Sequence, residues 1–224
     1  MQSESIKLFK MKKLLIASAV ALFGLSNAQI AKGTAYLSGS VGYSQEENNN
    51  DNSKLENFNV LPTVGYFVGT NLAVGLGVGY TNNKATLTTT GNIGGTSFTN
   101  ESKLTQDAFV VAPFVRKYWT LGDKLYIFGQ LQVPMEFGKV KSEDSTVSSL
   151  GNVSNSSEEK YTSVGVTVKP GLDYFLNKNW TIEATIGEFG YNNFKPKNAE
   201  AINNYNFGLN LSSVTIGVKY VFAK

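Results

Sequence analysis

The sequence contains no cysteine and no histidine, and these two absences exclude several classes of site. Without cysteine the chain cannot form a disulfide scaffold, and without either residue it cannot build a Cys/His metal site. Any mechanism that uses an imidazole as base or ligand is excluded as well. We expect no catalytic residue, no cofactor and no bound metal ion.

Long hydrophobic runs are also missing. The longest apolar run covers residues 14–25, whereas a membrane-spanning helix needs about 20 apolar residues. Lys12 and Lys13 precede this run and the small residues Ser26–Ala28 follow it, which is the pattern of a secretory signal peptide cleaved after Ala28. The basic pair directly follows a methionine, so we interpret residues 1–10 as a start-site artefact.

Basic residues do not outnumber acidic ones in the exported chain. Removing residues 1–28 takes away four lysines and one glutamate, and leaves 16 basic and 16 acidic side chains in residues 29–224. A nucleic-acid-binding surface needs a basic excess, usually with several arginines, and Arg116 is the only arginine. Nucleic acid is therefore not an expected partner.

Apolar residues alternate with polar or small ones over most of residues 29–224, and no segment has a sustained 3.6-residue apolar period. The clearest example is the alternation of Leu72, Val74, Leu76 and Val78 with alanine and glycine. Eight segments have this pattern: residues 34–44, 58–66, 72–80, 108–119, 125–137, 163–174, 180–186 and 214–222. The pattern predicts an all-β protein.

Short and long connections alternate between these segments. The short ones are residues 69–71, 121–123 and 176–179, and the long polar ones are residues 45–56, 82–102, 139–160 and 192–203. Short turns at one end and long loops at the other are typical of outer-membrane barrels. We therefore expect residues 29–224 to form a closed eight-stranded antiparallel transmembrane β-barrel, an up-and-down meander with both termini periplasmic.

Aromatic residues gather beside the short turns and near the C-terminus. Because amphipathic rings favour the headgroup level of a membrane, we expect them to form a girdle at the inner interface. The predicted girdle consists of Tyr66, Phe67, Tyr118, Trp119, Tyr174, Phe175, Trp180, Tyr220 and Phe222. The alternative is a set of scattered core aromatics in a soluble β-protein.

Three of the prolines inside predicted strands each lie two residues after a valine. They are Pro62, Pro113 and Pro170. A proline removes a ladder donor and is normally confined to sheet edges or bulges. Because a closed barrel has no edge, we expect a local bulge at each proline.

If valine, leucine and isoleucine face lipid, the inward face carries six charged residues. They are Arg116, Glu136, Lys169, Asp173, Glu183 and Lys219. Asp173 and Glu183 are expected nearly opposite each other, and two close carboxylates need cations nearby. We expect Arg116 and Lys169 to supply them, with the planar guanidinium of Arg116 as the hub of a charge-balanced plug. The alternative is individually hydrated side chains in a wet lumen.

Three segments carry a family resemblance, namely residues Pro62–Gly75, Pro170–Phe175 and Gly217–Phe222. With them, residues 30–224 resemble the small outer-membrane β-barrel family of OmpA-like and OmpX-like porin-type domains. The resemblance implies outer-membrane lipid as surroundings and the barrel-assembly machinery as a partner during biogenesis. Lipid A deacylases, palmitoyltransferases and omptin-type proteases of this architecture depend on a histidine, so we expect no enzyme.

The favoured function is structural, or an interaction of the cell surface with an extracellular ligand through the four long loops, because loops of such length commonly carry function. The first alternative is a narrow porin-like channel for ions or small solutes. The second is a soluble periplasmic lipocalin-like binder. Asn48–Asp51 together with Glu46 and Glu47 form a candidate site for loose binding of a hard cation, but solvated disorder is the favoured interpretation of this segment.

Overall fold

The computed structural model describes residues 30–208 and 214–222. The expected signal peptide, residues 1–28, lies outside the described residues. Within the described ranges no helix is long and apolar enough to cross a membrane. The strands are β1 (Ala35–Asn48), β2 (Ser53–Gly69), β3 (Leu72–Ile93), β4 (Thr96–Thr120), β5 (Leu125–Gln132), β6 (Met135–Ser148), β7 (Gly151–Phe175), β8 (Trp180–Ile186), β9 (Glu188–Pro196), β10 (Ile202–Gly208) and β11 (Val214–Phe222).

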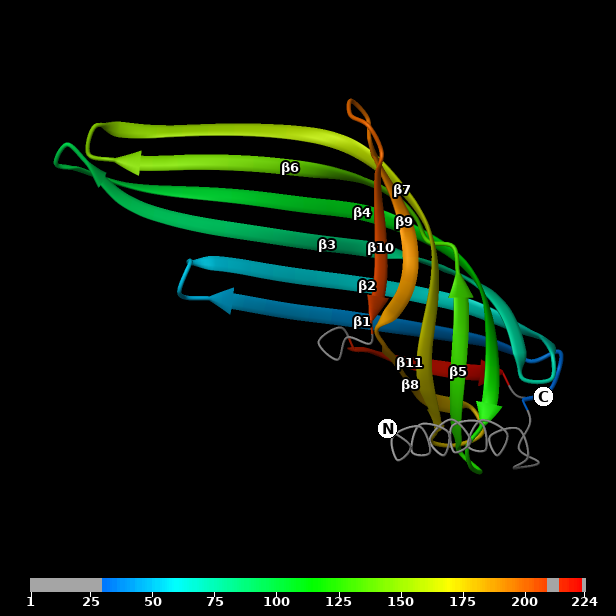
Figure 1. Cartoon of the computed structure of the whole chain (residues 1–224). Coiled ribbons are helices and arrows are strands. Elements are labelled where there is room, and N and C mark those ends of the chain that lie inside the picture. Colours follow the sequence, from blue (N-terminus) through cyan, green and yellow to red (C-terminus); the bar gives the residue numbers. More distant parts are fainter. Residues whose placement is uncertain (1–29, 209–213, 223–224) are drawn as a thin grey trace, which may run out of the picture.

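All of these strands belong to one antiparallel sheet (Figure 1). Near the short turns the pairing runs from β1 through β2, β3, β4, β5, β7, β8 and β11, and β11 pairs with β1 again. Farther from the short turns, β6 pairs with β4 and β7, and β9 pairs with β7 and β10. The sheet therefore has an inward and an outward face.

The structure has eleven described strands where the sequence predicted eight. The predicted strand 125–137 is interrupted at Pro134, and its two parts, β5 and β6, pair with the same two neighbours. Gly187, with a φ of 68°, separates β8 from β9. The hairpin of β9 and β10 covers most of residues 192–203, which were predicted to be a loop. The difference comes from interrupted strands and from one additional hairpin.

The four predicted long loops, residues 45–56, 82–102, 139–160 and 192–203, are β-hairpins, so this prediction is wrong. Only residues 49–52, 94–95, 149–150 and 197–201 connect their strands. Figure 1 shows the long strands extending well beyond β5, β8 and β11. These segments are rich in Asn, Ser and Thr and have water on both faces, so they lack the apolar alternation by which strands were recognised.

The bulge predicted at each proline occurs at one of the three. The register of β7 changes by one residue between its pairing with β8 and with β9, beside Pro170 and opposite Gly187. Pro62 pairs with Gly39 of β1 in unchanged register. At Pro113 the register of β4 is also unchanged, and the interruption between β5 and β6 lies opposite this proline. The expectation was wrong at Pro62 and Pro113.

The aliphatic side chains face outward and the ionic ones face inward. Val166, Ile182 and Ile216 are 49%, 42% and 61% exposed. Arg116 and Glu183 are 4% and 6% exposed. In a soluble sandwich or lipocalin the aliphatic face would instead form the dry centre.

Candidate functional site in the ring interior

Buried aromatic rings fill the interior near the short turns. The ring centroids of Tyr36 and Phe67 are 5.7 Å apart, those of Phe67 and Tyr118 are 5.5 Å apart, and those of Tyr118 and Phe128 are 5.8 Å apart. All four side chains are at most 1% exposed. Tilted pairs of this kind contribute about 0.5–1.5 kcal/mol each beyond the area they bury. They form a continuous chain of packed rings across the interior.

This packing changes the interpretation of the predicted aromatic girdle. Phe67 and Tyr118 are buried inside, and Phe175 packs against the same cluster. Among the predicted girdle residues, Tyr66, Tyr174, Trp180 and Phe222 are exposed, and Trp119, Phe175 and Tyr220 are half-buried. Consecutive residues on a strand point to opposite faces, so only one member of each adjacent pair can face outward.

Arg116 of β4 and Glu183 of β8 form a buried ion pair. Arg116 Nη1 lies 2.5 Å from Glu183 Oε2. Arg116 Nε donates to Gln130 Oε1 at 2.7 Å, and Nη1 also lies 3.2 Å from the Tyr118 hydroxyl. The guanidinium carbon is 4.2 Å from the centroid of the Phe128 ring, a cation–π contact. Ionic, polar and aromatic contacts thus fix this side chain.

Lys219 of β11 supplies the second cation. Its ammonium is fully buried and forms an ion pair with Asp173 of β7. Lys219 Nζ also lies 3.9 Å from Glu183 Oε2 and donates to the Tyr118 hydroxyl at 3.2 Å. The cluster of Arg116, Asp173, Glu183 and Lys219, called here the ionic plug, has two positive and two negative groups. Balanced charge is what makes buried ions tolerable.

Two details of the predicted network differ in the structure. Arg116 was expected to bridge both carboxylates, but it contacts Glu183 only, and Glu183 joins the two cations. Lys169 was expected to neutralise this pair, but its Nζ lies 3.1 Å from Glu188 Oε2. Lys169 lies four residues from Asp173 along β7, too far along the strand to neutralise it. Lys219 reaches the two carboxylates because β11 pairs with β8.

Other members of the site lie farther from the short turns or were not predicted. Glu136 Oε2 accepts a hydrogen bond from the Tyr161 hydroxyl at 3.5 Å, away from the ionic plug. Sequence reasoning missed Gln130 and Glu188 as partners, and it assigned Tyr118 to the interface. Tyr118 lies two residues after Arg116 on β4, and residues two apart on a strand point to the same face of the sheet. This spacing was the signal that could have predicted an inward position for Tyr118.

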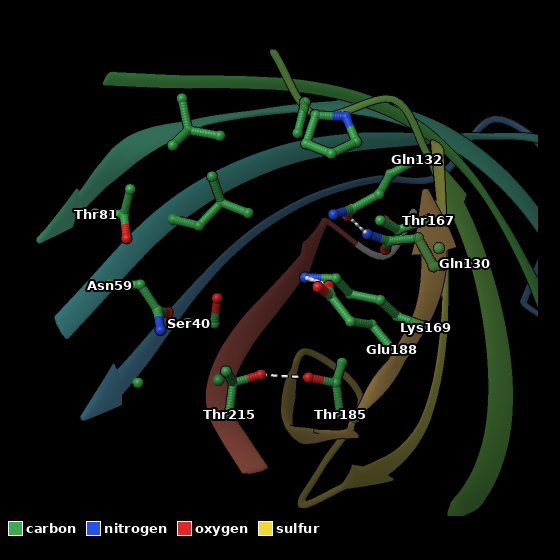
Figure 2. Close-up of a pocket in the computed structure, with 18 of the residues that line it drawn as sticks. Ser40, Asn59, Thr81, Gln130, Gln132, Thr167, Lys169, Thr185, Glu188 and Thr215 are labelled. Atoms are coloured by element: carbon green, nitrogen blue, oxygen red, sulfur yellow. Dashed lines mark hydrogen bonds and ion pairs between the residues drawn. The ribbon is translucent and has the colours of Figure 1, made fainter. Parts of the chain in front are cut away.

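Above the ionic plug, on the side of the long hairpins, the interior contains a cavity of about 650 Å³. Figure 2 shows its polar lining. Gln130 Nε2 donates to Gln132 Oε1 at 2.6 Å, Lys169 pairs with Glu188, and the hydroxyls of Thr185 and Thr215 are hydrogen bonded to each other. Arg116 and Glu183 also line the cavity. The cavity can accept water or a small polar solute.

The candidate cation site of Glu46, Glu47 and Asn48–Asp51 lies at the end of β1 and in the turn that leads to β2. Asp51 Oδ2 accepts from Asn48 Nδ2 at 3.0 Å, and Asp51 Oδ1 accepts from the Ser53 backbone N–H at 3.1 Å. Across the described part of the chain no group of three or more acidic side chains is placed to hold a metal ion. The two hydrogen bonds of the Asp51 carboxylate stabilise this turn.

Several solved structures resemble this chain at low sequence identity. Neisserial surface protein A matches with a TM-score of 0.40 and 15% identity, covering 86% of this chain and 97% of that chain. The N-terminal β-barrel domain of Pseudomonas aeruginosa OprF matches with a TM-score of 0.38 and 10% identity, covering 86% and 100%. Ail of Yersinia pestis matches with a TM-score of 0.36 and 15% identity, covering 85% and 99%. No curated protein matches the sequence.

The family comparison is more direct. The model of the outer membrane protein beta-barrel domain matches residues 15–222. This match agrees with the outward aliphatic face and the antiparallel meander, and it confirms the family resemblance seen in the sequence. The chain belongs to the outer-membrane β-barrel family, and the outer membrane is its location.

Proposed function

We propose that the chain is a closed eight-stranded barrel with a filled lumen, anchored in the outer membrane as a structural or surface-interaction protein. In this proposal residues 1–28 are a signal peptide, the barrel-assembly machinery inserts the chain, and both termini are periplasmic. In this proposal β5 with β6, β8 with β9, and β10 with β11 each count as one crossing strand, so that the eleven described strands make eight crossings. The long hairpins are extracellular, and catalysis has no part in the role.

The ionic plug is the observation that carries this proposal. Lys219 and Asp173 are 0% exposed, and Arg116 and Glu183 are nearly as buried. Tyr118 lies between the two cations and packs on the aromatic rings toward the short turns. An ion crossing the lumen would have to separate these groups and desolvate itself, which costs several kcal/mol per buried charge. A filled lumen favours anchoring over transport.

The hairpins supply the interaction surface. They are polar, and they are held by cross-strand hydrogen bonds such as that from Ser102 Oγ to Asp144 Oδ1 at 2.6 Å and that from Thr146 Oγ1 to Asn100 Oδ1 at 2.9 Å. A surface fixed by a backbone ladder loses less conformational entropy on binding than a flexible loop. The hairpins within residues 45–56, 82–102, 139–160 and 192–203 are the proposed contact regions for an extracellular ligand.

Two measurements test this function, the first on outer-membrane extracts and the second on the purified chain. In outer-membrane extracts the protein should require detergent and migrate differently on gels before and after boiling. In planar lipid bilayers it should remain electrically silent. Partition into the aqueous phase without detergent would overturn the membrane assignment, and sustained single-channel steps would overturn the filled lumen.

A narrow channel for ions or small solutes is the second candidate, because the polar cavity of about 650 Å³ occupies the lumen above the ionic plug. For conduction, the contacts of Arg116 and Lys219 would have to open. A Lys219→Met variant separates the two candidates. If ions pass the ionic plug, the wild type should conduct, and the single-channel conductance of the variant should differ from that of the wild type. A silent wild type excludes the channel.

A further inference from the structure

An exposed row of aromatic rings crosses the outward face of β3, β4 and β6. Figure 1 shows these long strands extending away from β5, β8 and β11. Tyr80 of β3 pairs directly with Phe109 of β4, and Phe109 pairs directly with Phe137 of β6. The three side chains are 41%, 52% and 54% exposed. These rings lie directly beyond the rows of outward aliphatic side chains. In membrane barrels, aromatic rings in this position mark the level at which the acyl chains end and the lipid headgroups begin.

Four lysines lie directly beside this aromatic row. Lys139 of β6 pairs with Lys160 of β7. The backbone N–H of Lys197 donates to the carbonyl of Lys160 at 2.9 Å, which places Lys197 next in the same row. Lys195 of β9 lies opposite Thr162 of β7. All four side chains are exposed. Lys139, Lys160 and Lys197 lie one step farther from the short turns than the aromatic row, whereas Lys195 lies at the level of that row, because Thr162 pairs with Phe137. The four residues are called here the lysine row.

The aromatic and lysine rows line one surface groove of about 750 Å³, called here the lysine groove. Asp107 is the single acidic residue among its lining residues, all of which are described. Its carboxylate accepts from the Tyr80 hydroxyl and from Asn82 Nδ2 at 2.7 Å. The groove therefore has four positive groups and one carboxylate, and that carboxylate is bonded to uncharged donors.

The placement of the lysines needs a counter-charge. Like charges directly opposite each other on a sheet destabilise it, and Lys139 and Lys160 are paired in this way. Glu158 pairs with Lys139 at 2.9 Å. Within residues 30–208 and 214–222, Lys160 and Lys197 have no ion pair. An anion in the groove would stabilise this arrangement.

We propose that the lysine groove binds the phosphorylated headgroup of a lipid in the outer leaflet. The ammonium groups of Lys160, Lys195 and Lys197 contact the phosphate, and the acyl chains lie along Phe109 and Phe137. Lysine is a strong point-charge ligand for phosphate, and the attraction of a membrane anion grows with each basic residue near the surface. The inference rests on the proposed function, since it requires the outward face to meet lipid and the hairpins to be extracellular.

The aromatic row is the reason to choose a lipid over free phosphate. A free anion would need only the lysines, whereas Phe109 and Phe137 extend the groove toward the aliphatic face. There Val164 of β7 is 49% exposed and pairs with Met135 of β6. Headgroup charge and acyl chains can therefore be bound together, each by matching chemistry.

The test uses the refolded full chain in detergent micelles and native mass spectrometry. The probes are diphosphorylated lipid A, fully dephosphorylated lipid A and inorganic phosphate. The triple variant Lys160→Gln, Lys195→Gln, Lys197→Gln removes the groove charge. The matched control Lys117→Gln, Lys124→Gln, Lys178→Gln removes the same charge from exposed lysines at the short-turn end. Only protein whose gel mobility changes on boiling is used for the binding measurement. A failure to fold or insert therefore counts against the proposed function, and a failure of folded protein to bind counts against the lysine groove.

We expect wild type to retain the diphosphorylated lipid, the groove variant to bind it roughly tenfold to a hundredfold more weakly, and the control to bind like wild type. Equal retention of the dephosphorylated lipid would overturn the inference, because acyl contacts alone would explain binding. Displacement by millimolar inorganic phosphate would also overturn it, since the groove would then be a free-anion site. Equal losses in both variants would show that net charge, and not the groove, is responsible.

Discussion

Asp173 and Glu183 lie directly opposite each other across β7 and β8, and each carboxylate is paired with a different cation. Asp173 binds Lys219 from β11, and Glu183 binds Arg116 from β4. Two adjacent carboxylates would repel each other if either cation were removed. The two ion pairs therefore depend on each other, and the plug is one unit that ties four strands together.

Replacing Arg116 by Ala should destabilise the folded protein strongly, by about 3–5 kcal/mol, because Glu183 would remain buried without its main cation. The measurement is urea unfolding of the protein in lipid vesicles, followed by tryptophan fluorescence. Lys117→Ala is the matched control, since the neighbouring side chain is exposed and should change the midpoint little. An Arg116→Ala midpoint equal to that of wild type would show that the interior charges are individually hydrated.

Lys219→Met and Asp173→Leu should each lower the free energy of unfolding. The double variant should lose less unfolding free energy than the sum of the two single losses. Each single change leaves one buried charge unpaired, whereas the double change removes the pair. A double-mutant cycle by urea unfolding measures the coupling, which we expect to reach about 1–3 kcal/mol. Additive effects would mean that Lys219 and Asp173 do not interact in the folded state.

Gly171→Ala should destabilise the protein because the interior rings need the space beside this glycine. A Cβ atom there would lie 2.2 Å from the Phe128 ring and 2.6 Å from the carbonyl oxygen of Ala184. Overpacking of this kind costs about 1–3 kcal/mol. Gly39→Ala is the control, because its Cβ would meet no atom within 4 Å. Equal unfolding midpoints for the two variants would contradict the packed interior.

Val168→Arg tests whether the outward face contacts lipid. Val168 is 44% exposed on the outward face of β7, and an arginine facing lipid near the bilayer midplane costs about 2–4 kcal/mol. The same change at Val153, which is 62% exposed on the hairpin of β6 and β7, should cost little because that side chain meets water. Vesicle refolding yields and unfolding midpoints provide the comparison. A harmless Val168→Arg would argue against a lipid-facing surface.

The period-2 alternation by itself determined much of this protein. It identified an all-β chain with aliphatic residues on one face and charged residues on the other, and the family match supports that interpretation. The sequence shows this alternation because the strands near the short turns have two different faces, one outward and aliphatic and the other inward and polar or charged. The polar hairpins have water on both faces, so nothing in their side-chain pattern distinguishes a strand from a loop, and only backbone pairing decided that they are strands.

The partners within the interior were decided by tertiary structure alone. Parity placed Arg116, Asp173, Glu183 and Lys219 on the inward face, but the order and register of the strands determined which of them meet. Lys219 lies 46 residues from Asp173 and 36 residues beyond Glu183 in the sequence, and it reaches both because β11 lies beside β8. A pattern along one strand carries no information about its neighbours, so side-chain pairing across the ring required the folded chain.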